Sequence, residues 1–291
     1  MWGMGRRIWQ MDALRGVAMA LMAVYHLLVD LRDFYGVAGI DYARPPLLLI
    51  GRASAVLFIL VAGASCALSK NNLRRGARVF AGGMAITAAT WLYVPTRALY
   101  IRFGILHFLG SAMAIAWAAR LLPAFAGGKA AAAKPAAGGE TAEGKPAAGG
   151  KALRSRMAAA APWLAAAVAC AAAGAALSGR TAGVPFLFPI GLPTEGFATY
   201  DYYPLFPWLA VFFAGVAAGA ALFQGRVPAA PAGASPSALP SEAGPPAAPE
   251  GNRPPAALRA LSAFGRKSFI FYFAHQPALI AVLELWFRLS R

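Results

Sequence analysis

Acidic residues, cysteine and histidine are all scarce in this chain of 291 residues. Asp and Glu number 11 against 27 Lys and Arg, and only 13% of the residues are charged, whereas 59% are hydrophobic. A soluble domain rarely has this composition, while a protein with several membrane spans commonly does. The shortage of charge therefore argues against a soluble protein and favours an integral membrane protein.

The only two cysteines, Cys66 and Cys170, both lie inside apolar segments and do not have the spacing of metal ligands. Cysteines in such positions usually act as small packing residues. The sequence thus excludes a disulfide framework and a cysteine-based zinc site, and we expect no metal cofactor.

The net charge of +16 raises the question of nucleic-acid binding. The lysines and arginines, however, lie mostly between the apolar stretches, where they set the orientation of a membrane protein. We therefore expect the lipid bilayer as a partner of this chain and no nucleic acid.

The apolar stretches predict an all-α fold, a polytopic membrane bundle of about seven transmembrane helices in a single domain over residues 1–291. Two stretches, 124–152 and 228–257, are rich in Ala, Gly and Pro and lack apolar periodicity, so we expect low-complexity cytoplasmic loops there. The predicted spans are 14–31, 47–68, 77–94, 103–122, 157–177, 204–223 and 268–287.

Basic residues set the predicted topology. With the N-terminus inside, 18 of the 27 Lys and Arg lie in cytoplasmic segments and 8 lie in external ones. The positive-inside rule favours this orientation, so we expect a multi-pass protein of the cell membrane with a cytoplasmic N-terminus. Asp12 and Arg15 interrupt the first apolar run, which favours an uncleaved first span over a signal peptide. The external stretch 184–194 carries three prolines, which indicates an interfacial or re-entrant loop rather than a helix.

Two polar residues of the first predicted span, Arg15 and His26, are eleven positions apart. Eleven helical steps of about 100° bring them onto one face, about 16 Å apart along the axis. Charged and titratable side chains inside a membrane helix are costly, so they usually face the bundle interior or a ligand. Asp12 precedes Arg15 by three positions and can pair with it, which by itself would serve only to fix the helix. Arg15 and His26 are the first candidates for function.

The remaining intramembrane polar residues sort by depth into two layers under this topology. All three histidines of the chain lie inside predicted spans, where they suit either proton transfer near neutral pH or hydrogen bonding between helices. The inner layer holds Asp12, Arg15 and His275, and the outer layer holds His26, Arg52 and His107. Asp201 and Glu284 lie close to the outer boundary, and we expect Asp30 in a solvated external loop.

The first span resembles the opening helix of the transmembrane acyltransferases. Asp12–Gly16 reads Asp-x-x-Arg-Gly and Arg15–His26 reads Arg-x10-His, which resembles the hallmark of the acyltransferase-three family. The rest of the chain is more similar to the catalytic domain of heparan-α-glucosaminide N-acetyltransferase and its bacterial relatives. The stretches that carry this resemblance are 54–69, 103–116, 201–219 and 261–279.

The resemblance implies a membrane enzyme that takes an acetyl group from acetyl-CoA on the cytosolic side. It would pass this group to an amine or hydroxyl of a sugar or glycan on the opposite side, an amino sugar in the lysosomal member. The family's histidine would be His26, carried over through the Arg-x10-His motif. In the lysosomal enzyme the implicated histidine lies in the loop after this helix, and the present chain has no histidine between Leu27 and Leu106.

On this basis we expect three groups of site residues. His26 would act as a general base or carry the acetyl group as an acyl-imidazole, and Asp12 would orient Arg15. The catalytic candidates are His26, Arg15, Asp12 and His107; the candidates for contacts to CoA are Arg15, His275, Arg266 and Lys267; and those for the acceptor are Arg52 and Asp201.

A proton-coupled transporter that uses the membrane histidines as relays is the alternative function. Transporters often contain inverted repeats with paired broken helices, and no convincing repeat relates the two halves of this chain. Binding of CoA would favour the enzyme, and substrate flux without acyl-CoA would favour transport; a structural membrane subunit would show neither. The sequence leaves a homodimer open.

Overall fold

The computed structural model describes residues 8–69, 71–93, 100–125, 147–223 and 255–290. These residues form α-helices and short 3-10 helices, and their extended segments make only an isolated bridge between Phe103 and Tyr202. The predicted all-α fold is therefore confirmed for the described residues. The chain divides into two compact units, residues 1–58 with 228–291 and residues 59–227, and each is described by itself.

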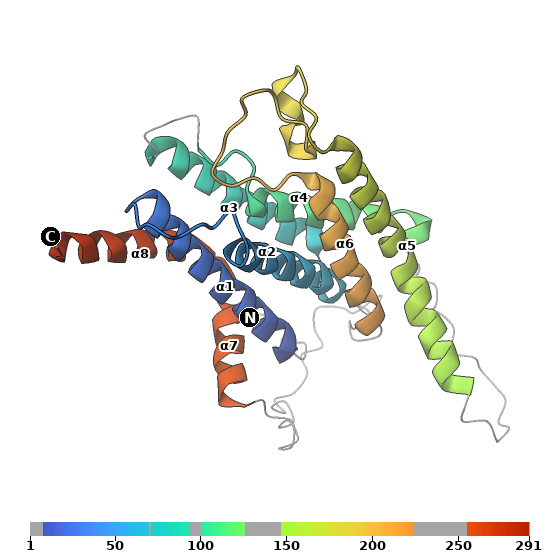
Figure 1. Ribbon diagram of the computed structural model, residues 1–291. Helices are drawn as coiled ribbons and strands as arrows, with labels where there is room; N and C mark the ends of the chain where they lie inside the picture. Colours follow the sequence, from blue (N-terminus) through green and yellow to red (C-terminus); the bar gives the residue numbers. More distant parts are fainter. Residues whose placement is uncertain (1–7, 70, 94–99, 126–146, 224–254, 291) are drawn as a thin grey trace, which may run out of the picture. The chain divides into compact units, whose positions relative to one another are not determined.

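The first unit is built around α1 (Trp9–Asp33) and contains the first part of α2 (Leu47–Ala64), α7 (Ala256–Arg266) and α8 (Ser268–Leu289) (Figure 1). No helix was predicted between the spans 204–223 and 268–287, and α7 corrects that expectation. This helix has only 11 residues and is amphipathic, so it is too short to register as a membrane span.

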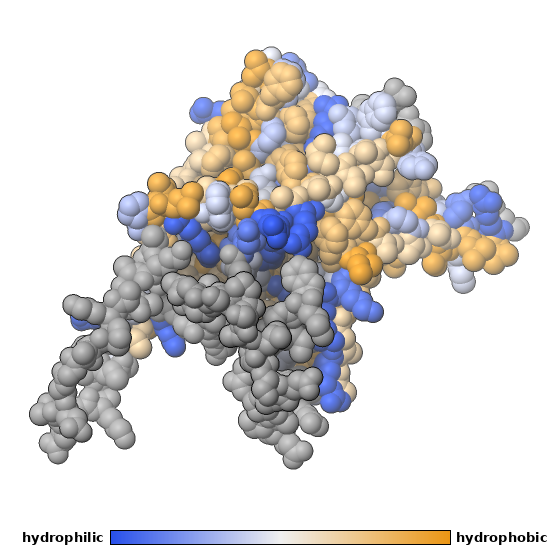
Figure 2. Space-filling model, turned by 180° about the vertical axis from the view of Figure 1, so that it is seen from behind, coloured by the Kyte–Doolittle hydropathy of each residue, from blue (hydrophilic) through white to orange (hydrophobic). Residues whose placement is uncertain are grey.

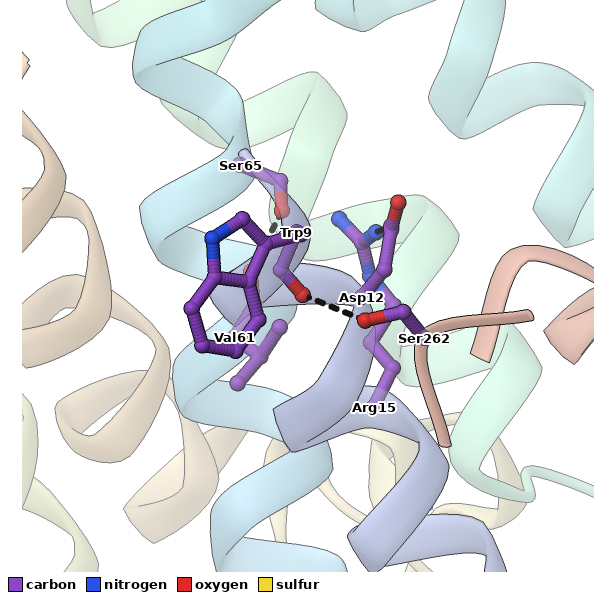
Figure 3. A network of polar contacts seen from close by, with 6 residues as sticks. All are labelled: Trp9, Asp12, Arg15, Val61, Ser65 and Ser262. Carbon is purple, nitrogen blue, oxygen red and sulfur yellow. Dashed lines mark hydrogen bonds and ion pairs between the residues drawn. The ribbon is translucent and has the colours of Figure 1, made fainter. Parts of the chain in front are cut away.

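Helix α7 crosses the first turns of α1 with the two backbones in direct contact. A side chain at Gly16 would meet the backbone of Leu261, and one at Gly265 would meet the backbone of α1. Ser262 Oγ donates a hydrogen bond to the carbonyl oxygen of Trp9 at 2.9 Å (Figure 3). Small residues at a crossing point let membrane helices approach closely. The glycine of the Asp-x-x-Arg-Gly motif therefore makes room for α7.

Helix α8 lies along the second half of α1 and runs in the same direction. The rings of His26 and His275 have centroids 5.2 Å apart, and Tyr35, just beyond α1, stacks on Phe287 at 4.4 Å. Both residue numbers increase together along this contact, so the two helices are parallel. In a protein with an odd number of membrane spans, the first and the last span cross the membrane in the same direction, as these two helices would.

The second unit contains the end of α2 and the remaining helices. Glycines again mark the closest approaches: Gly76 of α3 contacts Gly110 of α4, and Gly174 of α5 lies against Pro207 of α6. The elements are the 3-10 helix η1 (Ser65–Leu68), α3 (Asn72–Tyr93), α4 (Ile105–Ala119), the 3-10 helix η3 (Pro123–Phe125), α5 (Ala147–Leu177), the 3-10 helix η4 (Pro185–Ile190) and α6 (Leu205–Leu222).

Helices occur at all seven positions predicted for spans, but among the described residues only five are long and apolar enough to cross a membrane. These five are α1, α2 with η1, α5, α6 and α8. Helix α4 has 15 residues, and at 1.5 Å per residue it is about 22 Å long against about 30 Å of hydrocarbon. Helix α3 begins with several arginines and is less apolar. Seven spans are therefore not confirmed. On the face shown in Figure 2, hydrophobic residues cover much of the described surface.

The two predicted low-complexity loops lie largely outside the described residues. Residues 147–152 form the start of α5 and residues 256–257 the start of α7, so these parts of the predicted loops are helical instead. The residues that follow in both helices are rich in Ala and Leu, which favour helix, so α5 and α7 begin within the predicted loops. The stretch 184–194 contains no α-helix, as predicted, but Pro185–Ile190 forms the 3-10 helix η4.

Candidate active site

The predicted ion pair of the Asp-x-x-Arg motif forms in the first turns of α1. Arg15 Nη1 lies 2.6 Å from Asp12 Oδ1, and both side chains are largely shielded from solvent (Figure 3). The positive end of the helix dipole favours a carboxylate at this position. Because Gly265 contacts the carbonyl oxygen of Asp12, the pair lies at the crossing of α1 and α7.

His26 of α1 and His275 of α8 face each other with ring planes inclined by 58°. His275 was predicted in the inner layer and His26 in the outer layer, and this separation is wrong, because the two rings are in contact. The predicted depth of His275 followed from placing the start of the last span at the inner boundary of the membrane. In the structure Gly265 already lies against Gly16, ten residues before His26, and ten further residues bring the chain to His275. The crossing helix α7 thus sets the level of the second histidine.

The tautomer of His275 follows from its contacts. Nδ1 lies 2.9 Å from the carbonyl oxygen of Tyr272 and 3.2 Å from that of Phe271. A carbonyl oxygen only accepts hydrogen bonds, so Nδ1 carries the proton and Nε2 carries the lone pair. The ring is 8% exposed, and Nε2 has no hydrogen-bond partner among the described residues. His275 therefore holds an oriented basic nitrogen that the described chain leaves unused.

Asp30 and Gln276 extend this cluster by one turn, and neither was among the predicted site residues. Gln276 Nε2 donates to Asp30 Oδ1 at 2.7 Å. Asp30 is only 1% exposed, so its expected place in a solvated loop is wrong. Asp30 is four residues from His26, so both lie on one face of α1, and Gln276 directly follows His275. These two spacings are the features of the sequence that could have identified both residues.

Three buried acceptor atoms in these facing turns of α1 and α8 have no partner in the described chain. They are His275 Nε2, Gln276 Oε1 and the second carboxylate oxygen of Asp30. Leaving a buried polar group unpaired costs about 1–3 kcal/mol, so each such group requires an explanation, and a ligand-binding site is one. Acceptors without partners match a ligand that brings N–H or O–H donors.

His107, a predicted catalytic residue of the second unit, has both ring nitrogens engaged. Its Nδ1 accepts from the backbone N–H of Gly104 at 3.2 Å, so Nε2 carries the proton and donates to Thr87 Oγ1 at 3.2 Å. The Thr87 hydroxyl in turn donates to the carbonyl oxygen of Ile101 at 2.7 Å. The ring is 2% exposed and stacks on Phe103. This arrangement fixes the start of α4, and it leaves no nitrogen free for a substrate.

Asp201, expected to contact the acceptor, also belongs to the second unit. Its Oδ2 accepts from the backbone N–H of Ile105 at 3.1 Å at the first turn of α4. Burial raises the pKa of Asp201 to about 6, although the hydrogen bond from Ile105 acts in the opposite direction. In the first unit, Arg52 is exposed on α2, and Arg266 and Lys267 are exposed at the end of α7.

The structure thus joins two of the predicted residues, His26 and His275, and separately pairs Arg15 with Asp12. Along α1, Arg15 and His26 are about 16 Å apart by the helical rise. In the described parts of the chain, no group of three or more His, Cys, Asp or Glu side chains could hold a metal ion. Both cysteines are buried and unpaired, as expected for packing residues.

Comparison with known proteins gives one match. Residues 7–133 and 155–277 match the family model described as heparan-alpha-glucosaminide N-acetyltransferase, catalytic. The matched residues include both histidines of the α1–α8 cluster and the Asp-x-x-Arg-Gly motif. No curated protein and no solved structure gives a significant match. The match favours an enzyme over a transporter.

Proposed function

Because the chain belongs to the family of heparan-alpha-glucosaminide N-acetyltransferase catalytic domains, we propose that it is a membrane-embedded acyltransferase. It takes an acetyl group from acetyl-CoA on the cytosolic side and transfers it to an amine or hydroxyl of a sugar or glycan at the outer face. The observation that carries this proposal is the pairing of His26 with His275, whose Nε2 has no partner in the described chain.

In the proposed reaction the acceptor nitrogen or oxygen attacks the carbonyl carbon of the thioester. The bond from the acceptor to this carbon forms, the carbon–sulfur bond breaks, and its electron pair leaves with the sulfur of CoA. His26 takes the proton from the acceptor and returns it to the thiolate, so that no further reactant is needed. His275 Nε2 accepts a hydrogen bond from the charged ring of His26 and stabilises it.

Asp30 and Gln276 hold the acceptor in this proposal. Their unpaired oxygens are hydrogen-bond acceptors, and a sugar presents several hydroxyl or amine donors. A site built to hydrogen-bond a hydroxyl or amine rejects an analogue that lacks the group, because its own buried oxygens then stay unpaired. The two residues would therefore contribute to selectivity as well as to binding.

The cytosolic end of the site binds the anionic part of CoA. Arg15, positioned by Asp12, and the exposed Arg266 and Lys267 at the end of α7 supply positive charge at the crossing of α1 and α7. Arginine suits this task because its planar guanidinium can hold two oxygens of one phosphate. His275, which was predicted to contact CoA, is instead proposed to act beside His26 at the acceptor end.

The test measures transfer of labelled acetyl from acetyl-CoA to amino sugars by the purified chain. His26→Ala and His275→Ala should each slow transfer by about 10²–10⁴-fold, the usual contribution of a general base. Val24→Ala on α1 and Val282→Ala on α8 are matched controls, because both side chains are exposed, and they should leave transfer unchanged. Near-full activity of His26→Ala at normal protein levels would contradict the proposal, as would sugar flux across vesicles without acyl-CoA.

A second measurement separates direct transfer from an acyl-imidazole intermediate. The chain is incubated with labelled acetyl-CoA and no acceptor. If His26 carries the acetyl group, the label stays on wild-type protein and is absent from His26→Ala. Lack of label on the wild-type chain under sensitive conditions would favour direct transfer.

A further inference from the structure

A second polar cluster lies in residues 59–227, at the turn where α2 ends and α3 begins. The carbonyl oxygen of Cys66 in η1 accepts from Asn72 Nδ2 at 3.0 Å and from Arg120 Nη2 at 3.2 Å. Asn72 begins α3 and Arg120 follows α4, so three elements meet at this carbonyl. The guanidinium of Arg120 also lies 6.0 Å from the ring of Trp163 in α5.

Arg75, one turn into α3, is the member of this cluster whose side chain has no partner. It is partly buried, yet its guanidinium makes no hydrogen bond or ion pair with any described residue. Burial lowers the pKa of both Arg75 and Arg120, and the nearby Cys66 acts against this for each. The carbonyl oxygen of the Asn72 side chain, on a residue 2% exposed, also lacks a partner.

Among the residues of this unit that the structure describes, no acidic side chain lies close enough to neutralise these arginines. The sequence contains no Asp or Glu between Asp41 and Glu140. The acidic residues of this unit that the structure describes are Glu195 and Asp201. Asp201 lies at the start of α4 and Arg120 just beyond its end, which puts about 22 Å of helix between them.

Two partly buried cations that have no counter-ion among the described residues point to a bound anion. Removing a guanidinium from water is costly unless a charged partner compensates it. The first turn of α3 adds the positive end of a 22-residue helix dipole. Of the two arginines, Arg120 has a structural explanation, since its Nη2 donates to the carbonyl oxygen of Cys66 in η1. Arg75 has no such explanation.

We infer that Arg75 and Arg120, at the first turn of α3, bind a phosphate group. Given the proposed function, on which this assignment of the ligand rests, the phosphate belongs to the nucleotide end of acyl-CoA. That end carries a diphosphate and a 3′-phosphate, and this site binds one of these groups. An anionic lipid headgroup presents the same phosphate chemistry and is the alternative source.

The experiment measures binding by the full chain in nanodiscs of phosphatidylcholine, with CoA and phosphate-free pantetheine as probes. Wild type should bind CoA and bind pantetheine far more weakly. Arg75→Gln should weaken CoA binding roughly tenfold or more, as expected for loss of a charge-assisted hydrogen bond, and Arg75→Lys should restore part of it. Arg74→Gln is the matched control, because this neighbouring arginine is exposed, and it should bind like wild type.

A parallel arm uses native mass spectrometry of the chain in phosphatidylglycerol nanodiscs to identify a lipid source. Lipid retained by wild type and lost in Arg75→Gln, with CoA binding unchanged, would support the phosphate site and assign it to lipid. Equal CoA binding and equal lipid retention in Arg74→Gln, Arg75→Gln and Arg120→Gln would overturn the inference and leave the proposed function standing. Wild type that binds no CoA but retains lipid through Arg75 would instead refute the proposed function and support the site.

Discussion

The raised pKa of Asp201 predicts that the contribution of this residue to stability falls as the pH rises. This carboxyl lies in the connection before α6, and its Oδ2 faces the first turn of α4. Because its pKa is higher in the folded protein than the ordinary value of 3.8, the folded state binds the proton more tightly than the unfolded state. The contribution to stability is therefore complete below pH 3.8 and is lost as the pH rises through about 6.

The size of the effect follows from the change in pKa. A rise from 3.8 to about 6 corresponds to about 3 kcal/mol at about 1.4 kcal/mol per pKa unit. Asp201→Asn keeps an oxygen that can accept from the N–H of Ile105 but carries no charge at any pH. The variant should therefore match wild type near pH 4, and near pH 7 its free energy of unfolding should exceed that of wild type by up to about 3 kcal/mol.

The assay is unfolding of the detergent-solubilised chain between pH 4 and pH 8, followed by tryptophan fluorescence. Other titrating groups are common to both proteins and cancel in the difference between them. Glu195→Gln is the control, because this acidic residue of the same connection is exposed, and its difference from wild type should stay flat. A difference between Asp201→Asn and wild type that does not change with pH would refute the burial argument.

Two further predictions concern packing and hydrogen bonding. Gly265→Ala should destabilise the chain by about 1–3 kcal/mol, because the new methyl group meets the backbone of Asp12, whereas Gly150→Ala, in open space on α5, should stabilise it by about 0.5–1 kcal/mol. His107→Phe should cost about 1–3 kcal/mol by leaving the N–H of Gly104 unpaired, while the rate of transfer per folded molecule stays unchanged. Chemical unfolding and transfer assays on the same preparations check both.

The positions of the helices could be predicted because apolar side chains and their spacing are local properties of the chain. The Asp12–Arg15 pair could be predicted for the same reason, since side chains three positions apart lie on one face of a helix. The number of membrane spans could not be predicted in this way, because local apolarity locates a helix without deciding whether it crosses the membrane. Helices α3 and α4 pack closely on each other through Gly76 and Gly110, and neither has the length and apolarity of an independent span.

The wrong predictions for His275 and Asp30 have the same cause, which is that helix α7 was not predicted. A helix of 11 residues gives a weak signal, and its crossing with α1 depends on Gly16 and Gly265, which are far apart in sequence. That crossing decides how deep α8 begins. Without it, His275 could not be placed beside His26, and Asp30 could not be recognised as a buried partner of Gln276.

The sequence by itself determined that this is a helical membrane protein, and it determined the family and the Asp12–Arg15 pair; the role of His26 stays a prediction from its motif. These follow from composition, from helical periodicity and from motifs within single helices. The tertiary structure decided which residues lie together: His26, His275, Asp30 and Gln276 in one unit, and Asn72 with Arg120 at the carbonyl oxygen of Cys66 in the other. It decided this because the register between two helices is set by where small residues let their backbones touch, and no single helix contains that information.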